Sequence, residues 1–334
     1  MAEFFAMYKR LAFILTLVAS PFMSPVAAED AIWKIGVATH IQPLGLAEAR
    51  EFLAHKDDFV TAMSPLDRQI RVGSRQAVSE EAFLKYVADQ AIDWPDEELR
   101  RLSNIVRQLS EKLADYRLEL PQAIGLIKTT GKEEAGAPHC RRNSIVLPHG
   151  VLQRSDEQLE RLLAHELFHI LSRNNVDLRL RLYWIIGFEP CDPLQIPTTL
   201  KGRRITNPDE PQQRYRVQLM HNDRSIQVTP ILLWKTASFD LDQSRGLFDG
   251  WEAGWLEIAK NVDGWIVVRN NGIPVIHKFA DLPALQRRVG SNTDYVIHPE
   301  EILAENFAHL VMATKNLPDR QIVRQMREVL LATD

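Results

Sequence analysis

The residues with the clearest chemical potential form the segment His165-Glu166-Leu-Phe-His169 near the middle of the chain. Residues four apart lie on one face of an α-helix, so the two imidazoles can point at the same metal ion. Glu166 lies about 100° further round the helix, close enough to reach an attacking water without ligating the metal. This spacing predicts a Zn²⁺ site with His165 and His169 as ligands and Glu166 as general base.

The surrounding sequence predicts that this segment is a buried helix. Ser155 and Gln158 have the spacing of a capping box at its start. Apolar residues then follow along its flanks: Leu159, Leu162, Leu163, Leu167, Ile170 and Leu171. A chance match to the five-residue pattern would bury two imidazoles and a carboxylate without partners, which costs free energy. The context therefore favours a zinc site over a chance match.

A catalytic zinc site needs a third protein ligand, and the best candidate is Glu301. Pro299 suits the first position of a helix, on which Glu301 and Glu305 share a face that becomes apolar toward Met312. Buried carboxylates need a cation or strong donors. We therefore predict that Glu301 binds zinc and that Glu305 accepts the free N–H of a ligand imidazole. Two alternatives stay open: Glu300 is the ligand, or these acids merely favour a helix N-terminus.

The two segments together resemble the active-site helices of the gluzincin metallopeptidases. Thermolysin-like members pair the His-Glu-x-x-His helix with a Glu-x-x-x-Asp helix, and lethal-factor-like members with Glu-x-x-Ala-Glu. This chain has Glu305 at the last of these positions, and Glu301 follows His169 by 132 positions, more than in many relatives. The resemblance implies an α+β fold: a zincin-like core with a small mixed sheet and the active-site helix, a β-rich insertion and C-terminal helices.

The resemblance also implies an activity, namely zinc-dependent hydrolysis of peptide bonds in a peptide or protein substrate. Gluzincins often hold the oxyanion with Tyr or His, so Tyr295 is the expected donor, with His298 as its alternative. The strand before the metal helix, expected over residues 143–147, would lie along the cleft and pair with extended substrate. The two helices do not distinguish a protein substrate from another amide, such as a wall peptide.

A different class of function is an exported, non-catalytic binding protein with a structural zinc. Its β-rich insertion would recognise cell-wall or peptide material through the aromatic residues Trp234, Trp251, Trp255 and Trp265. Packing of these rings in a hydrophobic core is the favoured interpretation. Glu166 also favours an enzyme, because a structural zinc site has no need of that carboxylate.

The N-terminus predicts export. Lys9 and Arg10 precede an apolar run from residue 11 to 18, and small residues end at Ala28, as in a cleaved signal peptide. The run is short for a membrane span, although an uncleaved anchor is the alternative. We therefore expect a periplasmic or secreted protein with no stable membrane span after cleavage. After export, Cys140 and Cys191 could form a disulfide, the alternative being two buried thiols.

The net charge of −4 provides no basic footprint for nucleic acid. We expect a signal peptide over 1–28, an α+β part over 29–186, a loop and β-rich insertion over 187–294, and a helical part over 295–334. Hydrophobic periodicity predicts helices over 80–90, 96–116 and 178–186. Expected strands cover 33–37, 69–72, 123–130, 143–147, 215–220, 225–229, 256–260, 265–269 and 274–278.

Overall fold

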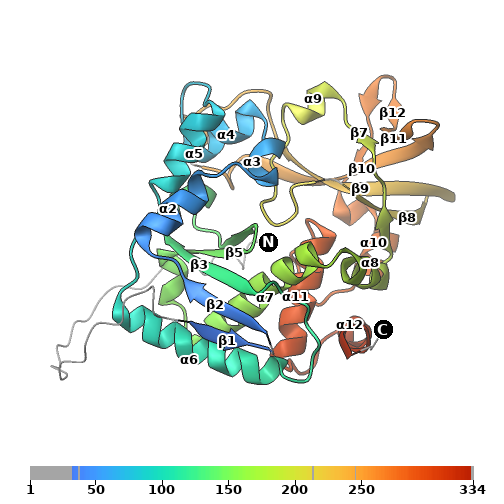
Figure 1. The fold of residues 1–334 in the computed structure, drawn as a ribbon. Helices are drawn as coiled ribbons and strands as arrows, with labels where there is room; N and C mark the ends of the chain where they lie inside the picture. The colour runs from blue at the N-terminus through green and yellow to red at the C-terminus, as the bar shows by residue number, and fades with distance from the viewer. Residues whose placement is uncertain (1–31, 37, 213, 245, 332–334) are drawn as a thin grey trace.

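The computed structural model describes residues 32–331, apart from residues 37, 213 and 245. The predicted signal peptide, residues 1–28, lies outside this part of the chain. The fold is α+β and contains two main sheets. Figure 1 shows the sheet of β1 to β5 on one side, the sheet around β8 to β10 on the other, and helices α7 and α11 in the middle. No helix within the described residues is long and apolar enough to cross a membrane.

The first sheet is small and mixed, as predicted. Its spatial order is β1-β2-β3-β5-β4, in which β2, β3 and β5 run parallel and the two outer strands run antiparallel to their neighbours. The strands are β1 (Trp33–Ile35), β2 (Thr39–Pro43), β3 (Ala123–Thr129), β4 (His139–Arg141) and β5 (Ser144–Pro148).

Both faces of this sheet are buried, because successive side chains of a strand point to opposite faces. Ile145 and Leu147 of β5 join the main core, whereas Val146 joins a second cluster beneath the N-terminal helices. These N-terminal helices are α2 (Leu46–Ala54), α3 (Asp58–Ala62), α4 (Pro65–Val72) and α5 (Glu80–Ala88), whereas α6 (Asp96–Leu113) packs in the main core.

The helix that carries the two histidines is α7 (Asp156–Asn174), and it begins as predicted. The Ser155 side chain accepts from the backbone N–H of Gln158, whose side chain accepts from the N–H of Ser155. Leu163, Leu167 and Leu171 of α7 are in the main core. The other long elements of this half are α8 (Val176–Ile185), α10 (Pro283–Val289), α11 (Pro299–Val311) and α12 (Arg320–Leu331).

The second sheet confirms a β-rich segment between the ligand helices. Its spatial order is β6-β8-β9-β10-β11-β7, with β14 beside β10. Its strands are β6 (Phe188–Pro190), β7 (Leu194–Gln195), β8 (Tyr215–His221), β9 (Arg224–Trp234), β10 (Trp251–Asn261), β11 (Gly264–Val267) and β14 (Ile276–His277), with a separate hairpin of β12 (Arg269–Asn270) and β13 (Ile273–Pro274). Short helical elements are η2 (Lys132–Glu134), η3 (His149–Gln153), α9 (Thr198–Lys201) and η4 (Phe279–Asp281).

Three of the four tryptophans in this region are buried, which confirms core packing as their role. Trp234, Trp255 and Trp265 are at most 7% exposed, and Trp251 is half-buried. Trp255 packs near Phe188 of β6 within the main core. These rings are therefore inside the protein and do not form a broad stacking surface.

One predicted strand is a helix, and another is a strand, as predicted, but cannot have the substrate-pairing role expected of it. The segment 69–72 is part of α4, because Ser64 caps the start of that helix, Pro65 takes its first position and Gly73 ends it with a φ of +66°. The segment 143–147 is not an edge strand: β5 pairs with β3 on one side and with β4 on the other. The edge that a peptide could approach belongs to β4.

The predicted disulfide between Cys140 and Cys191 is absent, and both thiols are free and buried. Cys140 lies on β4 in the main core, where its Sγ is 3.3 Å from the backbone oxygen of Glu166. Cys191 belongs to a separate cluster beneath the second sheet. The two cysteines therefore flank α7 in sequence but are held in different hydrophobic clusters.

His139, on the edge strand β4, predicts a loss of stability in acid. It is 2% exposed, and burial lowers its pKa to about 3. Its pKa in the unfolded chain is about 6.5. Neutral His139 therefore makes its full contribution to the free energy of unfolding above about pH 6.5. This contribution decreases as the pH falls toward 3, by about 2 kcal/mol at pH 5.

Urea unfolding at pH 7.5 and pH 5 measures this loss. His139→Gln removes the titrating group, so its free energy of unfolding should fall less between the two pH values than that of the unaltered chain. His149→Gln is the matched control, because the His149 side chain is 55% exposed. Equal pH dependence in His139→Gln and the unaltered chain would contradict the assignment.

Candidate metal centre

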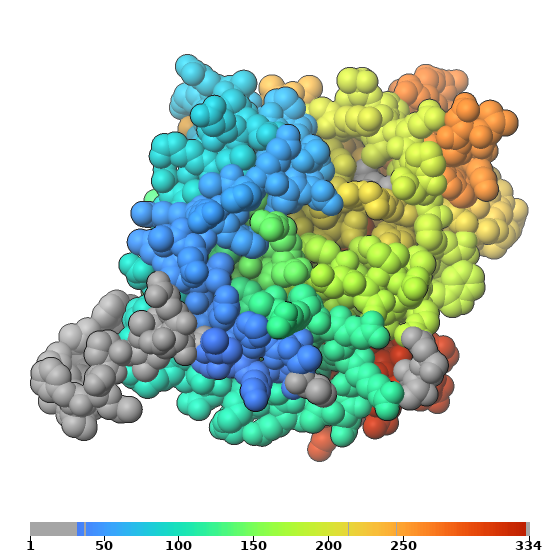
Figure 2. Space-filling view, viewed as in Figure 1, coloured from blue at the N-terminus to red at the C-terminus, as the bar shows by residue number. Residues whose placement is uncertain are grey.

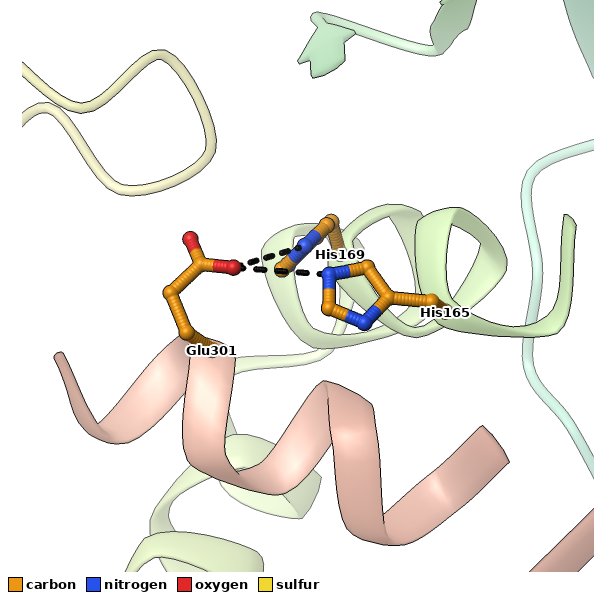
Figure 3. Close-up of side chains that lie close together, drawn as sticks. All are labelled: His165, His169 and Glu301. Carbon is orange, nitrogen blue, oxygen red and sulfur yellow. Dashed lines mark ion pairs between the residues drawn. The ribbon is translucent and has the colours of Figure 1, made fainter. Parts of the chain in front are cut away.

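Three side chains from α7 and α11 converge on one point. Figure 3 shows a single carboxylate oxygen of Glu301 facing the imidazoles of His165 and His169. This atom, Oε2, lies 3.4 Å from Nε2 of His165 and 3.7 Å from Nε2 of His169. Tetrahedral zinc with bonds of about 2.0–2.1 Å places its ligand atoms roughly 3.4 Å apart. The spacing of these donor atoms therefore suits one zinc ion.

Local sequence explains why the two helices hold these groups in place. The four-residue spacing stacks the histidines, whose ring centroids are 4.8 Å apart. On α11, Pro299 occupies the first turn, as predicted from the sequence, and His298 is the N-cap. Phe307 of α11 packs on Phe168 of α7, with ring centroids 5.7 Å apart. The helices therefore lie against each other along the face that carries the donors.

Each histidine has a second carboxylate at its other ring nitrogen. Nδ1 of His169 is hydrogen-bonded to Oε1 of Glu300 at 3.1 Å, and Nδ1 of His165 lies 3.0 Å from Oε1 of Glu305 in an ion-pair contact. Such partners orient a ligand imidazole and make it more basic. The structure thus places Glu301, and not Glu300, beside the two Nε2 atoms.

Glu300 is firmly held in this orienting position. Its Oε2 accepts from the hydroxyl of Ser172, 2.9 Å away, and from the hydroxyl of Tyr183. Glu305 is held in turn by an ion pair with the guanidinium of Arg161. These contacts fix the rings so that both Nε2 atoms face Glu301.

The charge balance of the cluster favours a cation. Burial alone would lower the pKa of both histidines, but nearby carboxylates outweigh it, raising the pKa of His169 to about 9 and that of His165 well above its ordinary value. Burial would raise the pKa of Glu301 and Glu305, but the imidazoles lower each to about 2. Several carboxylates therefore meet at a point where the imidazoles, Arg161 and, near Glu300, Arg179 carry the compensating charge.

One buried atom tests whether a metal fits. The His169 side chain is only 1% exposed, and its Nε2 has no hydrogen-bond partner among the described residues. An imidazole nitrogen in such surroundings normally finds a partner. Because it faces Glu301 and His165, a metal ion would satisfy it. Two imidazoles and one carboxylate are also a donor set that zinc uses in catalytic sites.

Glu166 lies beside the three donors at the inner end of a cavity. Its Oε2 is 3.3 Å from Sγ of Cys140, and burial raises the pKa of its carboxyl group. The cavity has a volume of about 470 Å³ and also exposes His165 and Glu301. A buried carboxylate with a raised pKa, next to a cavity, suits general acid–base catalysis.

Tyr295 lines the same cavity, whereas His298 caps α11. Desolvation in the cavity wall and the nearby Glu301, Asp209 and Glu166 raise the pKa of the half-buried Tyr295 well above its ordinary value. Nδ1 of His298 accepts from the backbone N–H of Glu300, 3.1 Å away. The structure thus brings the first expected oxyanion donor to the cavity and gives the second a structural contact.

Sequence reasoning missed a segment that crosses the site, residues 206–210, which we call the strap. Within it, the side-chain amide of Asn207 donates to Oε1 of Glu301, 2.6 Å away. Oδ1 of Asp209 accepts from the backbone N–H of Cys140 at 2.7 Å. Asp209, Glu166 and Cys140 offer donor atoms within 4.8 Å of one another. Asp209 also lines the 470 Å³ cavity.

The only sequence signal for a role of the strap in the site is its composition. Two acids follow Asn207-Pro208 in a proline-rich loop, but no periodicity or spacing ties them to the histidines. The strap is anchored from several directions: Arg173 donates to the carbonyl oxygens of Pro208 and Asp209, and Arg71 to that of Thr206. The segment between the ligand helices therefore contributes side chains to the site.

No protein-family model matches this chain, and neither does any curated protein or solved structure in the comparisons. Its function is therefore inferred from its own residues.

Proposed function

We propose that this protein is an exported zinc-dependent metallopeptidase of the gluzincin type. The single observation that supports this most is the convergence of His165, His169 and Glu301 on one point, with Glu166 beside them in an open cavity. His165, His169 and Glu301 would hold the metal, and Glu300 and Glu305 would orient the imidazoles. When bound, zinc would supply Lewis-acid chemistry to the scissile carbonyl and to an attacking water.

The chain's own residues account for the proton transfers. Glu166 accepts a proton from the attacking water and returns it to the leaving amine, which a buried carboxylate of raised pKa can do. The Cys140 thiol donates to Oε2 of Glu166, 3.3 Å away, and helps to hold this carboxylate, with Asp209 next to both. Tyr295 donates its hydroxyl hydrogen to the oxyanion that forms at the carbonyl.

A zincin-like core is part of this proposal. The mixed sheet with an antiparallel edge strand, β4, and the packing of α7 under that sheet support it. Residues 135–138 precede β4 and line the cavity. The N–H groups of Gly136 and Ala137 already bond to the carbonyl oxygens of Gly131 and Glu134, and that of Cys140 bonds to Asp209. An extended peptide would therefore pair there mainly by donating its own N–H groups to carbonyl oxygens.

Zinc content and peptide cleavage together test the proposal. We expect one zinc per chain, cleavage of a quenched-fluorescence peptide library, loss of cleavage on chelation and recovery on addition of zinc. Stoichiometric zinc without cleavage of any peptide would instead support the alternative, a non-catalytic exported binding protein. Buried Trp234, Trp255 and Trp265 leave that alternative without its aromatic surface. N-terminal sequencing of the mature protein tests export, with cleavage expected after Ala28.

Tyr295→Phe tests the oxyanion donor. Removal of one such hydrogen bond should lower kcat by about 10²–10³-fold, with a much smaller change in KM, because the contact forms in the transition state. Steady-state kinetics measure both constants. Zinc content should not change, since Tyr295 is not a proposed ligand. An unaltered kcat would remove Tyr295 from the mechanism.

A further inference from the structure

We infer that a second cavity, on the other side of the strap from the metal centre, binds a multivalent oxyanion. This basic cavity has a volume of about 550 Å³ and is lined by six basic side chains, Lys56, Arg141, Arg142, Arg173, Arg179 and Arg214. Only three acidic side chains, Asp57, Asp58 and Glu210, share the lining. The excess of positive charge is notable in a chain whose net charge is −4.

The acidic side chains of the basic cavity are already engaged. Asp57 pairs with Arg141 at 2.8 Å, and Glu210 pairs with Arg179 at 2.7 Å. Asp58 accepts from the amide of Gln212, 3.2 Å away. Arg141 and Arg179 are therefore neutralised by these partners, and Lys56 by Glu80 at 2.8 Å. Asp58 keeps its negative charge, so the three remaining arginines leave the cavity with a net positive charge.

Three arginines of the basic cavity have no carboxylate partner among the described residues. Arg173 donates only to backbone carbonyl oxygens, those of Arg142, Pro208 and Asp209. Arg142 lies over the ring of Phe52, 5.1 Å from its centroid. Arg214 is exposed at the start of β8. Uncompensated guanidinium groups around one cavity favour phosphate or carboxylate. The exposed Arg142 and Arg214 can donate two parallel hydrogen bonds to such an anion, whereas Arg173 contributes mainly its charge.

The elements of this region hold these charges together. Arg142 lies in the β4–β5 turn, Arg173 in the last turn of α7, and Arg214 just after the strap. In Figure 2, the blue atoms of the N-terminal helices, the green atoms near residue 140 and the yellow-green atoms of later segments meet in the middle of the face shown. Segments far apart in sequence thus meet where the cavity's lining residues come from.

The basic cavity and the metal centre are separate sites that share the strap. Pro208 and Glu210 line the basic cavity, whereas Asp209 between them lines the cavity at Glu166. The oxyanion site does not depend on the proposed peptidase activity. Its volume is in the range of small-molecule sites, so the ligand is a free oxyanion or a small molecule that carries one.

Calorimetric titration with inorganic phosphate and with citrate tests the site, at constant ionic strength and with chloride as the monovalent reference. We expect one phosphate or citrate per chain and no saturable heat with chloride. The tighter of the two ligands identifies the oxyanion as phosphate or carboxylate, and both results support the site. If neither phosphate nor citrate bound saturably, the proposed site would be wrong.

Two substitutions locate the binding. Arg142→Ala and Arg214→Ala should each weaken binding by about tenfold, as expected for loss of one charge-assisted contact. Both side chains are exposed, so the variants should fold, and circular dichroism checks this. Arg100→Ala is the matched control, because Arg100 is also exposed but lies on α6, outside the basic cavity. Equal affinity in all three variants and the unaltered chain would overturn the site, even if binding itself is seen. Zinc content should be unchanged throughout, which keeps this test distinct from that of the metal centre.

Discussion

Glu166→Gln is expected to lower kcat for peptide hydrolysis by about 10²–10⁴-fold, the usual contribution of a general acid–base residue. The amide has the shape of the carboxylate but cannot accept the proton. Zinc content should stay at one per chain, because the proposed ligands are His165, His169 and Glu301. Steady-state kinetics on a peptide substrate and metal analysis of the same preparation measure both quantities.

Glu157→Gln provides the control for this substitution. Glu157 lies in the first turn of the same helix but is exposed to solvent. Its replacement should leave kcat within a factor of about two, because Glu157 does not line the cavity and an exposed substitution usually has little effect on stability. If Glu166→Gln kept the activity of the unaltered chain, the peptidase mechanism proposed here would be wrong.

The second large effect separates Glu301 from Glu300. Glu301→Gln removes a proposed zinc ligand, whereas Glu300→Gln removes only the partner of Nδ1 in His169. Loss of such an orienting partner typically costs about 10–100-fold in metal affinity. We expect Glu300→Gln to lose zinc affinity within that range. Glu301→Gln should lose more, because it removes one of only three proposed protein ligands. Competition with a chromophoric chelator measures the zinc affinity of each variant.

Thermal unfolding of the two metal-free proteins is the accompanying control. Both carboxylates are buried, at 1% and 2% exposed, so either change could disturb folding. Similar unfolding temperatures would show that the difference in affinity arises at the metal. The reverse order of affinities would make Glu300 the ligand and refute the assignment of Glu301.

Local sequence signals predicted the elements that carry the proposed ligands. The capping box at Ser155 and the proline at 299 both mark helix starts that the structure has. Such signals act within a few residues, so they can be read from the sequence alone. Segment 69–72 is helical because the caps at Ser64 and Gly73 outweigh the β-propensity of Ile70 and Val72.

Long-range arrangement explains what could not be predicted. Whether β5 or β4 forms the sheet edge depends on how a two-residue turn folds β4 back onto β5. Similarly, Asn207 reaches Glu301 only because Arg71, Arg173 and Asp67 hold the strap from distant parts of the chain. Hydrophobic patterning reports which face of an element is buried, but not which loop covers it.

The distance along the chain between the two ligand helices has a consequence for biosynthesis. Glu301 leaves the ribosome 132 residues after His169, and Asn207, its hydrogen-bond partner, comes in between. A nascent or translocating chain that carries only the histidine pair would offer zinc an incomplete set of donors. Because metal binding and folding are coupled, the ion would be acquired only after the C-terminal helices have docked, in the compartment where the finished chain folds.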